Sequence, residues 1–203
     1  KQISVWGKAE ASASTDVLSP RDYSDFVFVD LEDARTGQWM ASANVYSDMV
    51  NAFVFVSPYP GKDIEPDDNT RYHRPIPGEA LFTIRKDDLE FGDVEFGFKL
   101  DRSISKTDLS LMAGRFYSNA AVYNFTGVYE MGKPVLEKTW QEFLMAGAAA
   151  AHAWQNFLFK LELAYKNDFP LQGITAQSIY VTEKKDLIDA AAVVEYDANS
   201  RYR

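Results

Sequence analysis

The stretch NFLFKLELAYKND, residues 156–168, alternates between apolar and polar positions almost without error. One parity carries the large apolar or aromatic side chains Phe157, Phe159, Leu161, Leu163 and Tyr165. The other parity carries the charged side chains Lys160, Glu162 and Lys166. A period of two predicts an extended strand with one apolar and one polar face. The apolar face could pack on a soluble core or contact lipid, and the rest of the chain has to decide between these two environments.

Seven further stretches show the same period and predict strands, most of them about ten residues long. They cover residues 2–16, 38–47, 51–57, 92–101, 107–117, 140–151 and 185–197. A helix competes only at the alanine-rich residues 146–153, because alanine has the highest helix propensity. The sequence therefore predicts an all-β fold with about eight strands.

The connections between the predicted strands alternate in length along the chain. Those after the first, third, fifth and seventh strands are long, whereas DMV (48–50), RSISK (102–106) and HAWQ (152–155) are short. Antiparallel up-and-down strands place odd connections at one end of a sheet and even connections at the other. Outer-membrane barrels have short turns at one end and long loops at the other, and a soluble meander has no reason to keep this order. The order therefore favours an antiparallel up-and-down transmembrane β-barrel, or part of one.

Aromatic side chains lie near the ends of several predicted strands. An aromatic belt at each membrane interface is typical of membrane-spanning strands, although aromatic residues are also common in strands generally. The strand centres in 2–16, 38–47 and 185–197 carry Ala and Val instead, which favours the belt. The predicted interfacial aromatic residues are Trp39, Tyr46, Tyr117, Trp140, Tyr165 and Tyr196.

The two parities then define two sets of candidate functional residues. The residues expected to face lipid are Val94, Phe96, Phe98, Leu100, Phe157, Phe159, Leu161 and Leu163. The residues expected to line a pore are Lys8, Glu10, Asp93, Glu95, Lys99, Lys160, Glu162, Asp189 and Glu195. Six of these nine are acidic, so strong anion selectivity is not expected. Opposite charges on facing strands can also pair and stabilise the wall.

The composition excludes several other classes of function. The 203 residues carry a formal net charge of −9, which disfavours nucleic-acid binding because phosphate neutralisation needs a basic surface. The chain has no cysteine and therefore no disulfide framework, thiolate nucleophile or cysteine-ligated zinc. His73 and His152 have no partner at metal-ligand spacing, and no Gly-x-Ser-x-Gly motif is present. We expect no enzyme activity, no catalytic or metal-binding residues and no cofactor.

Four motifs resemble a porin-like group of Gram-negative outer-membrane β-barrels of largely unknown function. They are DLSLMAGRFY (108–117), the W-x-x-F-x-M-x-G-A pattern at 140–148, FKLELAYKNDFP (159–170) and EKKDLIDAAAVVEYD (183–197). Members of such families are longer than this chain. The resemblance therefore implies that residues 1–203, expected to form a single β-barrel domain, are a fragment, the N-terminal half of a longer barrel.

The expected function is passive diffusion or uptake of small solutes through a pore in the bacterial outer membrane, where lumen width and charge decide which solutes pass. The expected partners are outer-membrane lipid, small solutes and other copies of the chain in a homo-oligomer. Two alternatives remain open. A soluble lipocalin-like barrel would bind a small apolar ligand with its apolar residues inside, and a structural outer-membrane barrel would have a plugged lumen.

Overall fold

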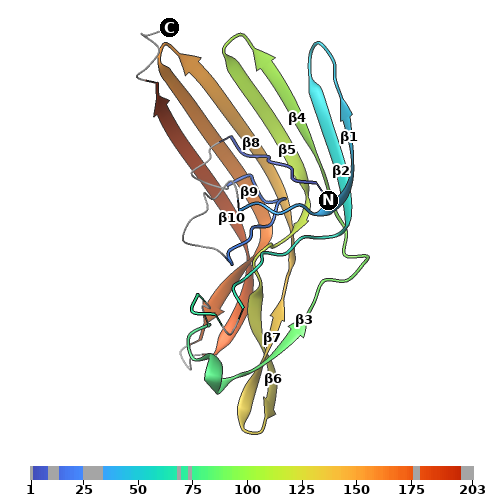
Figure 1. Ribbon diagram of the computed structural model, residues 1–203, viewed down its shortest axis with the longest axis vertical. Helices are drawn as coiled ribbons and strands as arrows, with labels where there is room; N and C mark the ends of the chain where they lie inside the picture. The colour runs from blue at the N-terminus through green and yellow to red at the C-terminus, as the bar shows by residue number, and fades with distance from the viewer. Residues whose placement is uncertain are drawn as a thin grey trace.

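The structure is a computed structural model that describes residues 2–8, 14–24, 34–67, 70–72, 75–175 and 179–197. These residues form ten β-strands in two sheets and one 3₁₀ turn, η1 (Glu79–Leu81) (Figure 1). No α-helix occurs in the described part of the chain, and the predicted all-β fold is confirmed. None of the described segments is a helix with the length and hydrophobicity that a membrane span requires.

The large sheet contains seven strands in the order β1-β2-β4-β5-β8-β9-β10, all antiparallel to their neighbours. Their bounds are β1 (Trp39–Val45), β2 (Asn51–Tyr59), β4 (Glu95–Ile104), β5 (Thr107–Tyr117), β8 (Glu142–Trp154), β9 (Phe157–Ile174) and β10 (Tyr180–Tyr196). Each strand pairs with the large-sheet strand before it along the chain, so the predicted up-and-down order is confirmed for these seven strands. The alanine run 146–153 lies inside β8, where its backbone pairs with β5 on one side and with β9 on the other.

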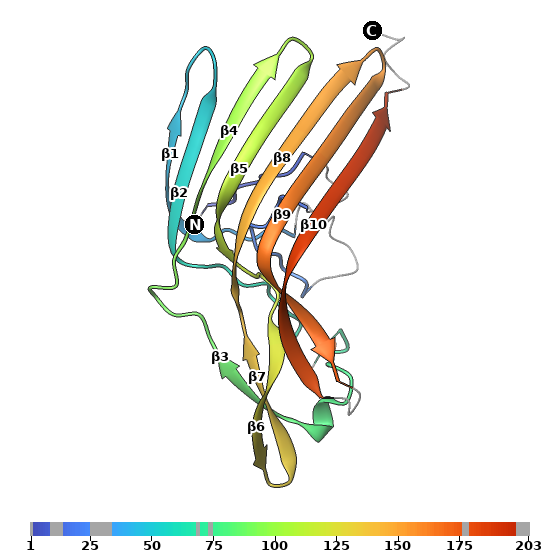
Figure 2. The ribbon, with the colours of Figure 1, turned by 180° about the vertical axis from the view of Figure 1, so that it is seen from behind.

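The three-stranded sheet was not predicted. It contains β3 (Thr83–Asp87), β6 (Val122–Glu130) and β7 (Lys133–Thr139) in the order β3-β7-β6, with β3 and β7 parallel. These short strands lie within the two long connections β2–β4 and β5–β8. Figure 2 shows this sheet below the long-connection end of the large sheet, opposite the short turns that join β1 to β2, β4 to β5 and β8 to β9. The predicted separation of long and short connections is therefore confirmed for these strands.

The predicted long loop after Asn167 is wrong. β9 and β10 continue past the other strands as one paired ribbon, and only 175–179 connects them. The ribbon bends at Asp168, which has φ 54°, and opposite it the register of β10 shifts between Lys185 and Leu187. A bulge of this kind lets a strand twist and continue. In the sequence the bulge breaks the hydrophobic alternation, so the strand was predicted to end there.

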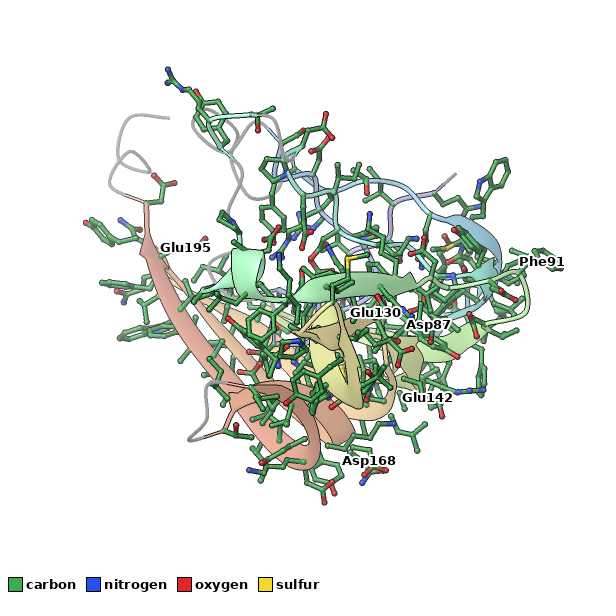
Figure 3. All side chains as sticks on the ribbon, turned by 90° about the horizontal axis from the view of Figure 1, so that it is seen from below. Asp87, Phe91, Glu130, Glu142, Asp168 and Glu195 are labelled. Atoms are coloured by element: carbon green, nitrogen blue, oxygen red, sulfur yellow. The ribbon has the colours of Figure 1, made fainter. Side chains whose placement is uncertain are left out.

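The predicted first strand, residues 2–16, is also wrong in its described parts. Residues 2–8 and 14–24, which we call the N-terminal segment, cross one face of the large sheet (Figures 1 and 3). Their described backbone bridges are isolated ones, from Gln2 to Gln38, from Arg21 to Arg35 and from Asp22 to Ile64. Burial does not follow the alternation of the sequence, since Trp6 is fully buried whereas Ile3 and Val5, on the apolar parity, are exposed. The centre of the predicted strand, 9–13, lies outside the described residues.

The main hydrophobic core lies between the N-terminal segment and the large sheet. Trp6 makes edge-to-face contacts with Phe55 and Phe116, at ring-centroid distances of 5.5 and 5.4 Å. Leu18 from the same segment and Met112 from β5 belong to this core. The core therefore covers one face of the large sheet. The sheet itself is open, because β1 and β10 are its two edges and are not neighbours in a closed barrel.

Candidate functional site on the two faces of the large sheet

The outer face of the large sheet, opposite the N-terminal segment, is apolar and exposed. Four residues predicted to face lipid have 43–57% of their surface exposed: Phe96, Phe98, Leu161 and Leu163. Leu100 on β4 is also exposed and has the same parity as the two phenylalanines. A contiguous apolar surface of this kind on a soluble monomer is unusual and marks an interaction with lipid or with another apolar partner.

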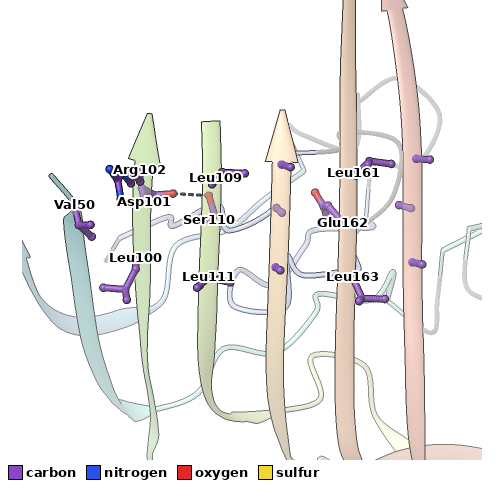
Figure 4. A pocket seen from close by; sticks show the side chains of 16 residues that line it. Val50, Leu100, Asp101, Arg102, Leu109, Ser110, Leu111, Leu161, Glu162 and Leu163 are labelled. Atoms are coloured by element: carbon purple, nitrogen blue, oxygen red, sulfur yellow. Dashed lines mark hydrogen bonds between the residues drawn. The ribbon is translucent and has the colours of Figure 1, made fainter. Parts of the chain in front are cut away.

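A shallow apolar hollow of about 730 Å³ lies on the outer face (Figure 4). Its floor consists of small residues on β8 and β10, among them Ala148, Ala150, Ala190 and Ala192. Its walls are the leucine pairs on β5 and β9, which are Leu109, Leu111, Leu161 and Leu163. The hollow forms because strands with small side chains lie next to strands with large ones. Both kinds of side chain are apolar.

The remaining three residues predicted to face lipid are partly covered. Val94 lies just before β4 and is half-buried. Phe157 and Phe159 are half-buried in an aromatic group near the short-turn end, where Phe157 lies 5.0 Å from Tyr196 and 6.4 Å from Trp154 between ring centroids. This group places four aromatic rings at the level where an interfacial belt is expected.

The inner face carries the charged parity, but the N-terminal segment covers much of it. Lys160, Glu162 and Lys166 on β9 are buried. Lys160 forms an ion pair with Glu195 at 2.5 Å, and Lys166 forms one with Asp189 at 3.2 Å. The predicted charges therefore lie on one face as expected, but those on β9 pair with β10 and contact the N-terminal segment instead of open water. Lys166 belongs to this row and was not among the predicted pore-lining residues.

Glu95 lies deepest of the predicted lumen residues, with 1% of its surface exposed. Its carboxylate accepts hydrogen bonds from the Tyr117 backbone N–H at 2.8 Å and from the Gln38 amide at 3.2 Å. Gln38 in turn accepts a hydrogen bond from the Gly61 backbone N–H at 2.8 Å. This network connects β4, β5 and the start of the long β2–β4 connection. Glu95 therefore holds parts of the fold together and does not line an open lumen.

The other predicted lumen residues occupy varied positions. Lys99 is half-buried on the inner side of β4 and lies 3.4 Å from Asp101. Asp93 precedes β4, and its carboxylate accepts hydrogen bonds from the Glu90 backbone N–H and the Tyr117 hydroxyl. Lys8 is in the N-terminal segment, and Glu10 lies outside the described residues.

The predicted aromatic belt divides into two groups. Trp39, Tyr46, Tyr165 and Tyr196 are exposed, as an interfacial position requires. Tyr117 and Trp140 are only 9% exposed and pack with Leu89 in a small separate core. The long connections fold back over this end of the sheet and bury both rings, so their predicted surface positions are wrong. The exposed Trp154, at the end of β8, was missed because it lies in a stretch that was expected to be a turn.

Contacts between the N-terminal segment and the sheet were not predicted, but two glycines could have indicated them. Glycine inside a strand often marks the close approach of another chain segment. A Cβ on Gly97 would lie 3.0 Å from the Trp6 ring, and a Cβ on Gly147 would lie 3.1 Å from Thr15 Cγ2. The segment is also anchored by Asp16, whose carboxylate accepts a hydrogen bond from Arg35 Nε at 2.9 Å.

A polar cleft of about 1310 Å³ lies at the long-connection end, between residues 62–67 and 70–72 on one side and the three-stranded sheet on the other. Lys138 there forms an ion pair with Glu65 at 2.5 Å. Burial lowers the pKa of Lys138, but hydrogen bonds with Glu65 and Tyr123 outweigh this effect, and the net pKa is raised. Burial also raises the pKa of Asp63, although a hydrogen bond from the Arg21 backbone N–H opposes the shift.

Comparisons with known proteins identify no relative of this chain: no family model, no curated protein and no solved structure matches it.

Proposed function

We propose that the chain forms part of the wall of a β-barrel in the bacterial outer membrane, and that small solutes diffuse through the lumen of this barrel. The outer face of the large sheet contacts lipid, and the inner face borders the lumen. In this arrangement the N-terminal segment lies inside the barrel and narrows the passage.

The observation that carries the proposal is the chemical contrast between the two faces. Leu161 and Leu163 are exposed on the outer face, while Glu162 between them is buried on the inner face. Removing apolar surface from water stabilises a protein by about 25 cal/mol per Å². An apolar face left in water does not gain this free energy, whereas an apolar face in contact with lipid does. The exposure of these leucines supports lipid contact over the lipocalin-like alternative, in which they would line a closed core.

The strand lengths agree with the same assignment. A tilted strand needs about 9–11 residues to cross the hydrocarbon layer. β4 has ten residues, β5 has 11 and β8 has 13, while the ribbon of β9 and β10 extends further. The excess length of the ribbon lies at the long-connection end, next to the three-stranded sheet (Figure 2).

Membrane extraction and solute permeation test the proposal separately. We expect the protein to need detergent for extraction from outer-membrane fractions and to resist carbonate washing. Purified protein in lipid vesicles should admit small sugars faster than empty vesicles do, in a swelling assay. Solubility without detergent, together with vesicles no more permeable than the empty control, would overturn the proposal.

A second candidate function is a structural barrel with a plugged lumen. It is favoured by the burial of Trp6 and Leu18, which fix the N-terminal segment firmly to the inner face. The two functions differ in the swelling assay, because a plugged barrel requires detergent but does not admit sugars.

A further inference from the structure

We infer that Glu162 is a positioning residue that holds the N-terminal segment across the inner face and thereby sets the width of the lumen. This inference rests on the proposed function, because a lumen width has meaning only if the inner face borders a passage. The attachment itself is a property of the described contacts and can be tested without any transport.

One carboxylate joins two separate points of the segment to β9. One oxygen of Glu162, Oε1, accepts a hydrogen bond from the backbone N–H of Lys8. The other, Oε2, accepts hydrogen bonds from the Thr15 hydroxyl at 2.9 Å and from the Thr15 backbone N–H at 3.3 Å. A single side chain therefore holds two separate points of the segment, Lys8 and Thr15.

The chemistry of the partners matches a carboxylate side chain. All three groups donate, and a carboxylate is the side chain that accepts at both oxygens. Glu162 is only 3% exposed, so water competes little for these hydrogen bonds. An amide at this position would present an NH₂ group to one of the donors and could satisfy only one of the two attachment points.

The surroundings of Glu162 are fitted to the segment. A Cβ added to Gly7 would lie 2.9 Å from Glu162 Oε1, so the chain passes the carboxylate at a distance that only glycine permits without a shift. A Cβ added to Gly147 on the neighbouring strand β8 would lie 3.1 Å from Thr15 Cγ2. Thr15 is therefore held by its hydrogen bonds on one side and by van der Waals contact on the other.

The neighbouring charges on β9 have a different task. Lys160 and Lys166 pair with Glu195 and Asp189 on β10 and so stabilise the strand pair. Ser14 also donates a hydrogen bond to Asp189, at 3.0 Å, which adds one contact next to the main attachment. Glu162 differs from these residues because its described hydrogen bonds lead to the backbone and side chain of the segment.

Cysteine labelling tests the attachment directly, since the chain has no cysteine of its own. Leu18→Cys places a reporter at a fully buried position of the segment. In this background, Glu162→Ala should speed maleimide labelling by about tenfold or more, the factor that corresponds to about 1.4 kcal/mol. Glu162→Gln should give an intermediate rate, because the amide can satisfy one attachment point.

Two variants at Thr15 keep the test decisive if Glu162→Ala fails to fold. Thr15→Val keeps the shape and removes the hydroxyl donor, so it should also speed labelling. Thr15→Ser keeps the donor and loses only the methyl group near Gly147, so it should label more slowly than Thr15→Val. Asp101→Asn is the matched control. Its carboxylate lies on the same face but is bonded to Ser110, at 2.5 Å, and to Lys99. Equal labelling rates in the parent, the Glu162 variants and Asp101→Asn would overturn the inference.

Vesicle swelling with sugars of increasing size supplies the second readout. Glu162→Ala should admit larger sugars than the parent protein and Asp101→Asn do, and an unchanged size limit together with faster labelling would refute the role in lumen width. If neither parent nor variant admits any sugar, the proposed passage fails, while the labelling rates still decide whether Glu162 attaches the segment.

Discussion

Replacing Trp6 by alanine should weaken the attachment of the N-terminal segment more than any other single truncation in that segment. The indole is fully buried and contacts Phe53, Phe55 and Phe116 edge-on. A tryptophan buries about 200 Å², which at about 25 cal/mol per Å² corresponds to about 5 kcal/mol. The indole N–H is buried and has no hydrogen-bond partner among the described residues, which costs about 1–3 kcal/mol. The expected net loss for Trp6→Ala is therefore about 2–4 kcal/mol.

Urea unfolding in lipid vesicles, followed by circular dichroism and limited proteolysis, measures this loss. Trp6→Phe keeps a ring against Phe55 and Phe116 and removes the unpaired N–H, so it should cost less than about 1.5 kcal/mol. Val5→Ala is the neighbouring control, because Val5 is exposed and such changes stay within about 0.5 kcal/mol. A Trp6→Ala protein that is as stable as Val5→Ala, and no more sensitive to protease in residues 2–24, would refute the role of the indole as the anchor.

Three other substitutions test separate parts of the structure. Leu161→Arg should impair insertion into vesicles by about 2–4 kcal/mol, because it puts a cation on the lipid-facing side, whereas Met131→Arg at an exposed turn should insert normally. Because the pKa of Asp63 is raised in the folded state, the parent protein should lose stability as pH rises from about 4 through that pKa. In urea unfolding, the stability of Asp63→Asn should depend less on pH in this range and should not be lower than that of the parent at pH 7. Gly97→Ala should cost about 1–3 kcal/mol in urea unfolding, because its Cβ would lie 2.8 Å from a backbone oxygen, and Gly173→Ala, with its closest contact at 3.3 Å, should cost less.

The large sheet could be predicted because its strands alternate in a simple way. β5 begins at Thr107 and ends at Tyr117, at the two positions that the sequence predicted. A strand with an apolar face and a charged face leaves a period of two in the sequence whichever solvent each face contacts. The same period cannot tell which of the two faces is covered by another part of the chain, so the burial of Glu162 and Lys160 could not be foreseen.

The missed strands have physical reasons of their own. β3 and β7 are short, with five and seven residues. They pair in parallel and so join two long connections, and a local sequence pattern does not encode such a pairing. The ribbon of β9 and β10 was missed because Pro170 and Gly173 resemble loop residues. In the structure Pro170 pairs with Lys184 inside the ribbon.

The direction of the edge strands has a consequence for closure of the sheet. Seven strands, each antiparallel to the last, leave β1 and β10 pointing the same way. If these two edges met directly, they would form a parallel seam, whereas bacterial single-chain barrels are antiparallel throughout and contain an even number of strands. An all-antiparallel closure therefore requires an odd number of additional strands between β10 and β1, whichever polypeptide supplies them.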